Sequence, residues 1–302
     1  MNRRYELQVL ERGWLSSNNI VVGGADEATV IDTGYVSHAE QTETLVREAL
    51  RGRHLQRIVN THLHSDHCGG NVRLQRAFGC EICIPPGQWD AVARWDTDAL
   101  TYAPTGQRCE RFHADRQLVP GGALEMGGRA WSVLAAPGHD PHSVILFDTL
   151  DATLVSADAL WENGFGVVFP ELEGAHGFED VSTTLDLIAG LQPRLVIPGH
   201  GRPFCDVGPA IERARRRLDA LAAEPARHAR HAAKVLLKFR VLETQREMLS
   251  GLLEWAESLD YMQLIHRRHF AAEARSEWIA SLLDEMCASG ALRREGSWID
   301  NR

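Results

Sequence analysis

The chain has 302 residues, of which 44% are hydrophobic and 24% charged, and its formal net charge is −9. This length is sufficient for one large domain, or for a large and a small domain, and the ordinary composition excludes a disordered chain or an array of short repeats. No stretch reaches the roughly 18 apolar residues that cross a membrane, so the sequence predicts no membrane partner.

The first two hundred residues repeat short β-branched runs that are followed by turn-forming residues. Runs of this length predict strands. Eight strands are expected, at 19–22, 28–31, 57–61, 81–84, 131–135, 144–148, 153–156 and 195–197. Helix-like stretches at 37–51 and 181–190 carry apolar residues at helical spacing. The alternation of strands and helices predicts a layered α/β sandwich.

After Pro209 the sequence changes to long segments rich in alanine, leucine, arginine and glutamate. We therefore predict a catalytic domain over residues 1–210 and a smaller helical domain over 211–302. Within the second domain, 232–259 and 278–289 are expected to be helices, and 291–299 a hairpin. Helices followed by a hairpin are typical of a winged-helix-like domain. A helical cap that only packs on the first domain fits the same pattern.

The segment 57–70 concentrates side chains that bind metals. A predicted strand runs there into a turn with the pattern His62-x-His64-x-Asp66-His67. Two histidines that lie two positions apart on extended backbone point the same way, so both imidazoles can reach one cation. Asp66 and His67, on the following turn, would face a second cation. Imidazole and carboxylate groups are ligands that zinc, manganese or iron accept.

This segment resembles the signature of the metallo-β-lactamase superfamily, and the other motifs of that family follow in order. They are Pro137-Gly138-His139, Ser156-Ala157-Asp158 and Pro198-Gly199-His200-Gly201, together with the early Asp32 of an Asp-Thr-Gly turn. The resemblance covers roughly residues 15–205. It implies an αββα metallo-β-lactamase sandwich, which a small C-terminal helical, winged-helix-like domain would follow here.

The resemblance also implies a role for each of these side chains. Three histidines would hold a first metal ion, and an aspartate and two histidines a second, namely His62, His64 and His139, then Asp66, His67 and His200. Asp158 would bridge both ions, and Asp32 would support the ligands from behind. The implied cofactors are two divalent metal ions, Zn²⁺ as the first choice and Mn²⁺ or Fe²⁺ as alternatives.

Two cations that share a water lower its pKa toward neutrality. The expected nucleophile is therefore a metal-bridging hydroxide, which would attack a polarised carbonyl carbon. Asp66 and Asp158 are the expected catalytic carboxylates, and Asp66 could receive the proton. The sequence contains no Gly-x-Ser-x-Gly elbow that would indicate a serine nucleophile. It therefore predicts a metal-dependent hydrolase.

Three features are candidates for contact with the substrate. Trp161 and Phe165 follow Asp158 closely in the sequence, although packing in the core explains them equally well. The segment 85–120 contains several aromatic residues and is a candidate lid, with ordinary packing as the alternative. His142 is a candidate substrate or phosphate contact, with stabilisation of a turn as the alternative.

The metal ligands alone do not select a substrate, because similar sites in this superfamily hydrolyse several kinds of bond. The favoured function is hydrolysis of a thioester or related ester-like bond, since the first domain resembles the hydroxyacylglutathione hydrolases. The first alternative is a ribonuclease for single-stranded RNA, because 137–142 and the C-terminal segment resemble the mammalian β-lactamase-like protein 2 branch. A lactonase, a mononuclear iron oxygenase and a non-enzymatic sensor are further alternatives.

The distribution of charge favours a small-molecule substrate. Residues 1–210 carry 16 basic and 27 acidic side chains, whereas 211–302 carry 16 and 14. An acidic catalytic domain disfavours nucleic acid as a partner. The arginines at 213 and 215–217 could bind phosphate, or could form a solvated helix face. A homo-oligomer is not excluded, and six scattered cysteines with no apolar leader segment predict a cytoplasmic protein.

Overall fold

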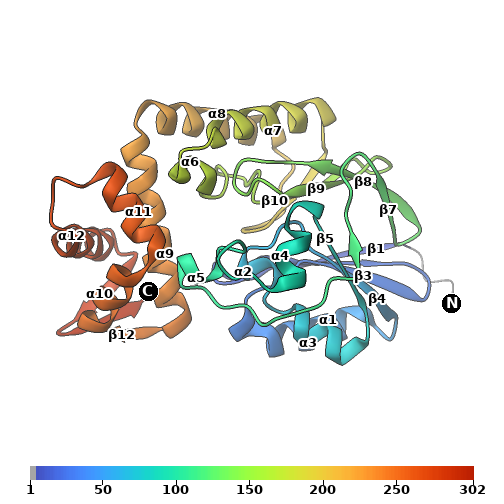
Figure 1. The fold of residues 1–302 in the computed structure, drawn as a ribbon. Helices are drawn as coiled ribbons and strands as arrows, with labels where there is room; N and C mark the ends of the chain where they lie inside the picture. The colour runs from blue at the N-terminus through green and yellow to red at the C-terminus, as the bar shows by residue number, and fades with distance from the viewer. Residues whose placement is uncertain (1–4) are drawn as a thin grey trace.

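Two β-sheets packed face to face form the centre of the molecule (Figure 1). The computed structural model describes residues 5–302. The first sheet has the order β1-β2-β3-β4-β5-β6, antiparallel as far as β3 and parallel beyond it. Its strands are Glu6–Leu10, Asn19–Gly23, Glu27–Ile31, His54–Val59, Glu81–Ile84 and Arg116–Gln117.

The second sheet has the order β11-β10-β9-β8-β7. It is antiparallel except for the parallel pair β10 and β11. In chain order from β7 to β11, its strands are Ala123–Met126, Arg129–Ala135, Val144–Asp148, Thr153–Ala157 and Leu195–Pro198. The carboxyl ends of β10 and β11 are followed by Asp158 and His200, so the sheet itself brings these two side chains together.

Alternate residues of the central strands contribute to different cores. In β4, Ile58 packs against the outer helices, whereas Val59 faces the second sheet. In β10, Leu154 and Val155 divide in the same way between the outer and the inner core. Because these strands are buried on both faces, they read as continuous apolar runs rather than as alternating patterns.

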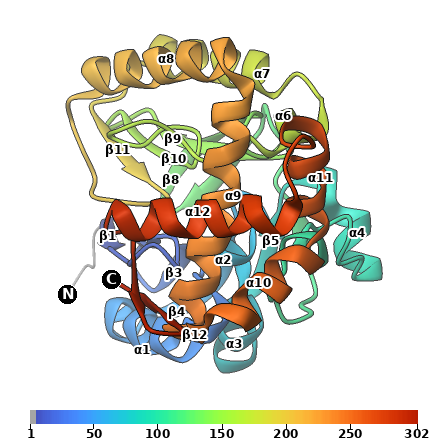
Figure 2. The same ribbon diagram turned by 90° about the vertical axis from the view of Figure 1, so that its left-hand side faces the viewer.

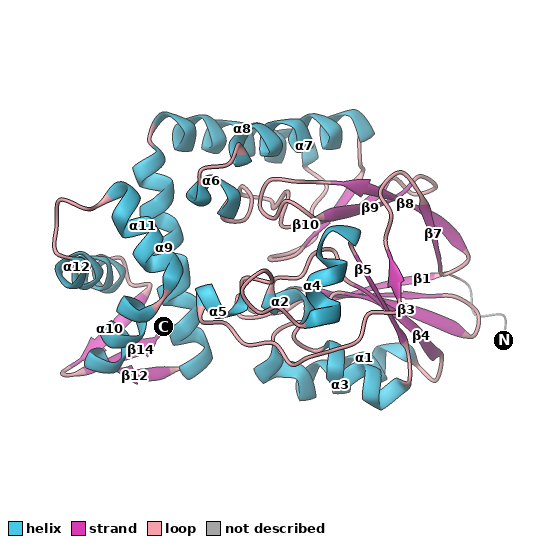
Figure 3. Cartoon of the chain, viewed as in Figure 1, coloured by secondary structure: helices cyan, strands magenta, loops and turns pink. Residues whose placement is uncertain are grey.

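Helices cover the outer face of each sheet, so the layers follow the order αββα (Figure 3). The first sheet is covered by α1 (Ala39–Leu50) and α3 (Asn71–Phe78), and the second by α7 (Gly177–Leu191) and α8 (Val207–Ala223). Connecting segments contain four short helices and two 3₁₀ turns: α2 (Ser65–Cys68), α4 (Trp89–Arg94), α5 (Tyr102–Thr105), α6 (Phe169–Glu173), Val36–His38 and Pro86–Gln88. This is the sandwich that the sequence predicts.

The eight predicted strands are all present, and their ends shift by no more than three residues. The largest shift is at the start of β4, which begins at His54 instead of Arg57. This strand also ends at Val59 instead of continuing to Thr61. It ends early because the Thr61 backbone N–H donates a hydrogen bond of 2.9 Å to the Asp32 carboxylate instead of to a neighbouring strand. The sequence did not indicate β1, β6 or β7.

The C-terminal segment contains four helices and a small sheet (Figure 2). They are α9 (Pro225–Thr244), β12 (Arg246–Met248), α10 (Leu249–Ser258), α11 (Asp260–His269), α12 (Arg275–Ala288), β13 (Leu292–Glu295) and β14 (Trp298–Asn301). The expected hairpin is therefore present as β13 and β14. The single helix expected over 232–259 is wrong. It breaks at Gln245, which has a positive φ of 62°, so that β12 can pair with β14.

Helix α8 runs across the predicted division after residue 210. Its buried face, which includes Ala214 and Leu218, belongs to the core outside the second sheet. The segment from α9 onward has a core of its own, which contains Leu237 and Trp278 and also takes in Leu172 of α6. Within the described residues, no helix combines the length and the apolar character needed to span a bilayer.

A buried carboxylate joins α9 to the sandwich. The Tyr35 hydroxyl, which lies just before α1, donates a hydrogen bond of 3.1 Å to Glu243, and Arg108 Nε donates one of 2.6 Å to the same carboxylate. The Phe239 ring packs edge-on against Tyr35, one helical turn earlier. These contacts hold the C-terminal end of α9 beside the sandwich.

Replacing Glu243 by alanine should therefore destabilise the fold. The change leaves the buried Tyr35 hydroxyl and the Arg108 guanidinium without their acceptor, so we expect a loss of about 2 kcal/mol in the free energy of unfolding. Urea denaturation followed by circular dichroism measures it. Glu48→Ala, on the exposed face of α1, is the control and should change the value by less than about 0.5 kcal/mol. Equal effects of the two substitutions would contradict this role of Glu243.

Candidate metal centre

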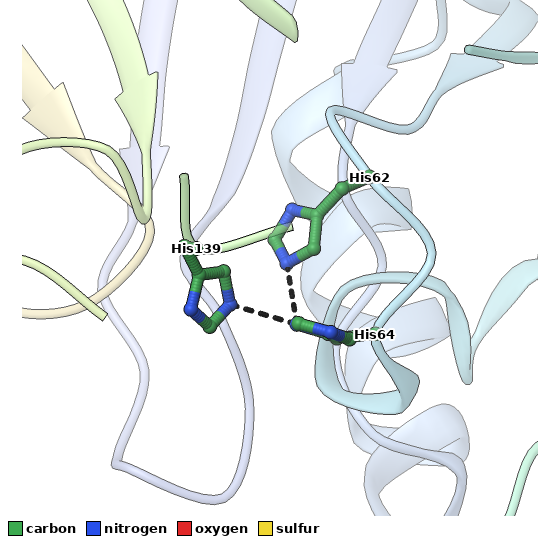
Figure 4. A group of neighbouring side chains, drawn as sticks. All are labelled: His62, His64 and His139. Atoms are coloured by element: carbon green, nitrogen blue, oxygen red, sulfur yellow. Dashed lines mark hydrogen bonds between the residues drawn. The ribbon is translucent and has the colours of Figure 1, made fainter. Parts of the chain in front are cut away.

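Three histidines from two loops form the first group of ligand-type side chains (Figure 4). His62 lies in the bend that follows β4, His64 follows on extended backbone, and His139 comes from the loop after β8. His62 Nε2 lies 3.1 Å from His64 Nδ1, which lies 2.7 Å from His139 Nε2. The two histidines of the first motif therefore point the same way, as their spacing predicts.

The short helix α2 turns the chain immediately after His64 and directs Asp66 and His67 to a second group, which also contains His200. His200 Nε2 lies 3.0 Å from Asp66 Oδ2. Asp66 Oδ2 is also 3.9 Å from His67 Nε2. The ligand atoms of this trio all lie within 4.8 Å of one another.

Asp158 lies between the two groups. Its Oδ2 is 3.3 Å from His139 Nε2 in the first group, and 3.5 Å and 3.9 Å from the Nε2 atoms of His67 and His200 in the second. The structure therefore brings together all seven side chains that the sequence singled out as ligands, with Asp158 in the place expected of a bridging group.

The protonation states suit metal ligands, which must be neutral imidazoles and ionised carboxylates. Burial, reinforced by neighbouring histidines, lowers the pKa of His62 well below its usual value and that of His64 to about 4. Burial alone would raise the pKa of Asp158, but His67 and His200 hold it well below its usual range. His62 and His64 are thus neutral and free to donate a lone pair, and Asp158 is charged.

His67 shows most directly that a cation fits here. Its buried Nε2 has no hydrogen-bond partner, although it faces Asp66 and Asp158. Burial alone would lower its pKa, yet Asp158, Asp32 and Asp66 hold that pKa well above the usual value. A divalent cation at Nε2 would satisfy the same carboxylates as the proton does, so the donor set fits a metal ion.

The remaining nitrogens of two ligands are fixed by hydrogen bonds from behind. Asp32 Oδ2 accepts a hydrogen bond of 2.8 Å from His67 Nδ1, so Nε2 is left for the metal side. The Thr61 backbone N–H and hydroxyl also donate to this carboxylate. His139 Nδ1 donates to the Val167 carbonyl at 2.5 Å. Such contacts set the tautomer and orientation of a ligand, as expected of Asp32.

Four residues that the sequence did not single out also shape the site. Trp14 stacks on His200 with ring centroids 5.4 Å apart, and Phe169 packs edge-on against His64 at 5.1 Å. Asp140 faces His64 Nε2 at 3.8 Å. The Asn18 side chain donates to the carbonyls of Pro198 and Gly201, and thereby fixes the loop that carries His200. Of these four residues, only Asp140 lies next to a predicted ligand, directly after His139, so it alone could have been suspected from the sequence as a residue of the site.

A cavity of about 410 Å³ opens beside the ligands, within the usual size range of ligand pockets. Trp161 and Phe165 both line it, as one of the two interpretations of the sequence predicts. Phe165 also belongs to the core under α7 and α8, so the packing interpretation is correct for that residue too. Trp161 Nε1 donates a hydrogen bond of 3.2 Å to Asp158 Oδ1.

The candidate lid and His142 differ from expectation. The segment 85–120 does reach the cavity, but through Thr101, Thr105 and Gln107. Its aromatic residues, such as Tyr102 and Phe112, pack in the core of the first sheet instead. The His142 ring lies outside the cavity against Gly87, where an added Cβ would come within 2.1 Å of Nδ1, so the interpretation as a turn residue describes its position better.

Comparisons with known proteins agree with this geometry. The family model described as "Metallo-beta-lactamase superfamily" matches residues 12–200. A hydroxyacylglutathione hydrolase of Hyphomonas neptunium is 29% identical over 170 residues, which cover 56% of this chain and 52% of that protein. The chain thus spans about half the length of this relative. The acyl-coenzyme A thioesterase MBLAC2 of Homo sapiens is 25% identical over 224 residues, covering 65% of this chain and 78% of that protein.

Similarity to solved structures extends over the C-terminal helices. A metallo-beta-lactamase family protein from Thermus thermophilus is 21% identical, and its structure matches with a TM-score of 0.56. The match covers 99% of this chain and 98% of that chain. At this identity the similarity concerns the fold. It includes the segment that follows the residues matched by the family model.

Asp32→Asn should weaken metal binding, because the amide no longer offers two charged acceptors to His67 and Thr61. We expect the affinity for Zn²⁺ to fall about 10- to 100-fold, with an unchanged circular dichroism spectrum. Competition with a chromophoric chelator measures the affinity. Asp26→Asn, at an exposed turn next to β3, is the matched control. An unchanged affinity in Asp32→Asn would show that this carboxylate does not orient His67.

Gly199→Ala should displace two ligands at once. A Cβ at this position would lie 2.2 Å from Asp158 Oδ1 and 2.9 Å from His67 Cε1. We therefore expect the purified variant to contain fewer metal ions per chain, by elemental analysis. Gly208→Ala, whose added Cβ would meet no atom within 4 Å, should retain the wild-type content. Equal metal content in both variants would contradict the close approach at Gly199.

Proposed function

The chain belongs to the metallo-β-lactamase superfamily, and on that premise we propose that it is a binuclear metal-dependent hydrolase of a thioester or related ester-like bond. One observation carries the proposal. Seven ligand-type side chains converge in two groups around Asp158 at the floor of a largely apolar cavity. Such a site suits a small-molecule substrate whose reactive bond reaches the floor while its apolar part occupies the walls.

The two groups would each hold one divalent cation, with Asp158 between them. We favour Zn²⁺, and the same ligands accept Mn²⁺ or Fe²⁺. Bound cations of this kind lower the pKa of a water toward neutrality and polarise the bond under attack.

The protein's own residues orient the site and accept protons. Trp161 Nε1 donates a hydrogen bond to Asp158 Oδ1, so the other carboxylate oxygen, Oδ2, stays directed toward His139 and His67. Asp66 lines the cavity. Burial alone would raise its pKa, but His67 and His200 keep it below its usual value, so Asp66 is a carboxylate that can take the proton released during hydrolysis.

The walls of the cavity favour an acyl group. Trp14, Phe169, Val235 and Phe239 line it together with the aromatic rings of Trp161 and Phe165. Apolar walls exclude bulk water and bury the hydrocarbon part of a substrate. The two relatives named above, a hydroxyacylglutathione hydrolase and an acyl-coenzyme A thioesterase, support a thioester as the first choice.

The ribonuclease alternative has less support from the arginines of α8. Arg213 donates to the Glu162 carbonyl, Arg215 pairs with Asp186, and Arg216 lies 3.8 Å from Glu212. These three side chains therefore have acceptors within the chain and do not form one phosphate-binding cluster.

A panel of substrates tests the proposal. An acyl thioester, a homoserine lactone, a β-lactam, a phosphodiester and single-stranded RNA are offered to the Zn²⁺-loaded protein, and initial rates are compared. We expect the thioester to have the highest kcat/KM. His64→Ala and Asp158→Ala should each reduce that value by more than about 100-fold and lower the metal content, because each removes a ligand.

His113→Ala is the matched control, since this histidine is exposed and lies outside the cavity. It should retain wild-type rates. Full thioesterase activity in Asp158→Ala would contradict the proposed metal site. Preferential cleavage of RNA would replace the thioester with the alternative substrate.

A further inference from the structure

One cation of the cavity wall has no anionic partner. Arg217 projects from α8 into the cavity, and its Nη2 lies 3.1 Å from His231 Nε2 on α9. Among residues 5–302, no carboxylate lies within 4.0 Å of its guanidinium. Arg213 of the same helix also has no carboxylate partner, but it donates to the Glu162 carbonyl and does not line the cavity. Arg217 is thus the α8 arginine that offers its charge to the cavity.

His231 does not neutralise this charge. Burial, together with Arg217 and Lys234, lowers the pKa of His231 to about 4, so the ring is neutral and accepts the hydrogen bond through Nε2. Burial also lowers the pKa of Arg217, but a guanidinium remains charged at neutral pH. A half-buried charge without a counterion is unfavourable in the free protein, and an anionic ligand would compensate for it.

The loop that follows Asp158 places this charge within reach of the metal ligands. An added Cβ at Gly164 would lie 2.9 Å from Arg217 Nη1, and one at Gly166 would lie 2.4 Å from His139 Nδ1. Two residues of chain span at most about 7 Å, so the guanidinium lies within roughly 15 Å of His139. The Phe165 ring fills the interval, with its centroid 5.3 Å from the Arg217 Cζ.

Two other charged side chains line the cavity apart from the metal-ligand carboxylates. Glu162 and Arg202 are both exposed at its rim. Water screens them more strongly than it screens the half-buried Arg217. Away from the metal-binding floor, a negatively charged group that enters the cavity would therefore be attracted mainly by Arg217.

We propose that Arg217 binds an anionic group of the substrate, a carboxylate or a phosphate, several bonds away from the thioester that reacts at the metal ligands. This inference rests on the proposed function and narrows it to acyl thioesters that carry a negative charge. Arg217 would act as a specificity residue. Its contact lies far from the reacting atoms, so it should affect KM more than kcat.

Three matched thioesters test the inference. The neutral parent is S-octanoyl-N-acetylcysteamine. A second compound replaces the terminal methyl of the octanoyl chain by a carboxylate, and a third carries a phosphate on the N-acyl group of the thiol part. We expect one anionic compound to have a KM about 10- to 100-fold lower than the parent, which also shows which end of the substrate carries the charge.

Arg217→Met should abolish this preference, so that the anionic compounds lose their lower KM relative to the neutral parent. Arg217→Lys should retain part of it, because the ammonium keeps the charge without the forked geometry. Arg216→Met, an exposed neighbour on the same helix, is the control and should behave as the wild type. An unchanged circular dichroism spectrum shows that each variant is folded.

The corresponding thioethers, which cannot be hydrolysed, separate the two proposals. Their binding is measured by calorimetry with wild-type protein and with the same variants. Arg217-dependent preference for an anionic thioether without any thioester hydrolysis would support the inference and contradict the proposed function. Hydrolysis of thioesters with no anion preference, or with one that survives in Arg217→Met, would overturn the inference.

Discussion

The rest of the site depends on the contacts between the ionised Asp158 carboxylate and the three histidines around it. This carboxylate is buried, and burial of a lone carboxylate is unfavourable unless positive charge or hydrogen bonds compensate for it. Here the compensation comes from His67, His139 and His200, which approach from three different loops. Those loops lie at the ends of strands from both sheets, so the αββα sandwich is the scaffold that makes one carboxylate common to two groups of ligands.

Unusual backbone geometry accompanies this arrangement. Asp32 and Ala157 both have positive φ, 56° and 47°, although neither is a glycine. Ala157 immediately precedes Asp158, and the pairing of β10 with β11 shifts its register there. A side chain other than glycine in this region costs of order 1 kcal/mol or more, and such residues concentrate at functional sites. At both positions the strained residue directs or holds a ligand, which is consistent with a site that the surrounding sheets keep in place.

The convergence of the candidate metal ligands could be predicted from sequence because ligand chemistry depends on residue type, and strand-end motifs keep such residues together along the chain. His62, His64, Asp66 and His67 lie within one turn, and the strands before them have clear apolar runs. The cavity walls could not be predicted in this way. Trp14 and Phe169 contact His200 and His64 only through the tertiary fold, and their neighbours in sequence carry no corresponding signal. The same limit explains α9, whose helical pattern continues through Gln245 until pairing with the C-terminal hairpin interrupts it.

The C-terminal segment is part of the cavity rather than an appendage to it, because His231, Val235 and Phe239 of α9 line the cavity. Ligand-type side chains from the sandwich and walls from this segment together define one site, and the chemistry that we propose for it requires two cations around Asp158. Titration of metal-free protein with Zn²⁺, followed by calorimetry and checked by elemental analysis, tests this requirement most directly. Two equivalents bound per chain are predicted, and saturation at one equivalent, or no binding, would contradict the account.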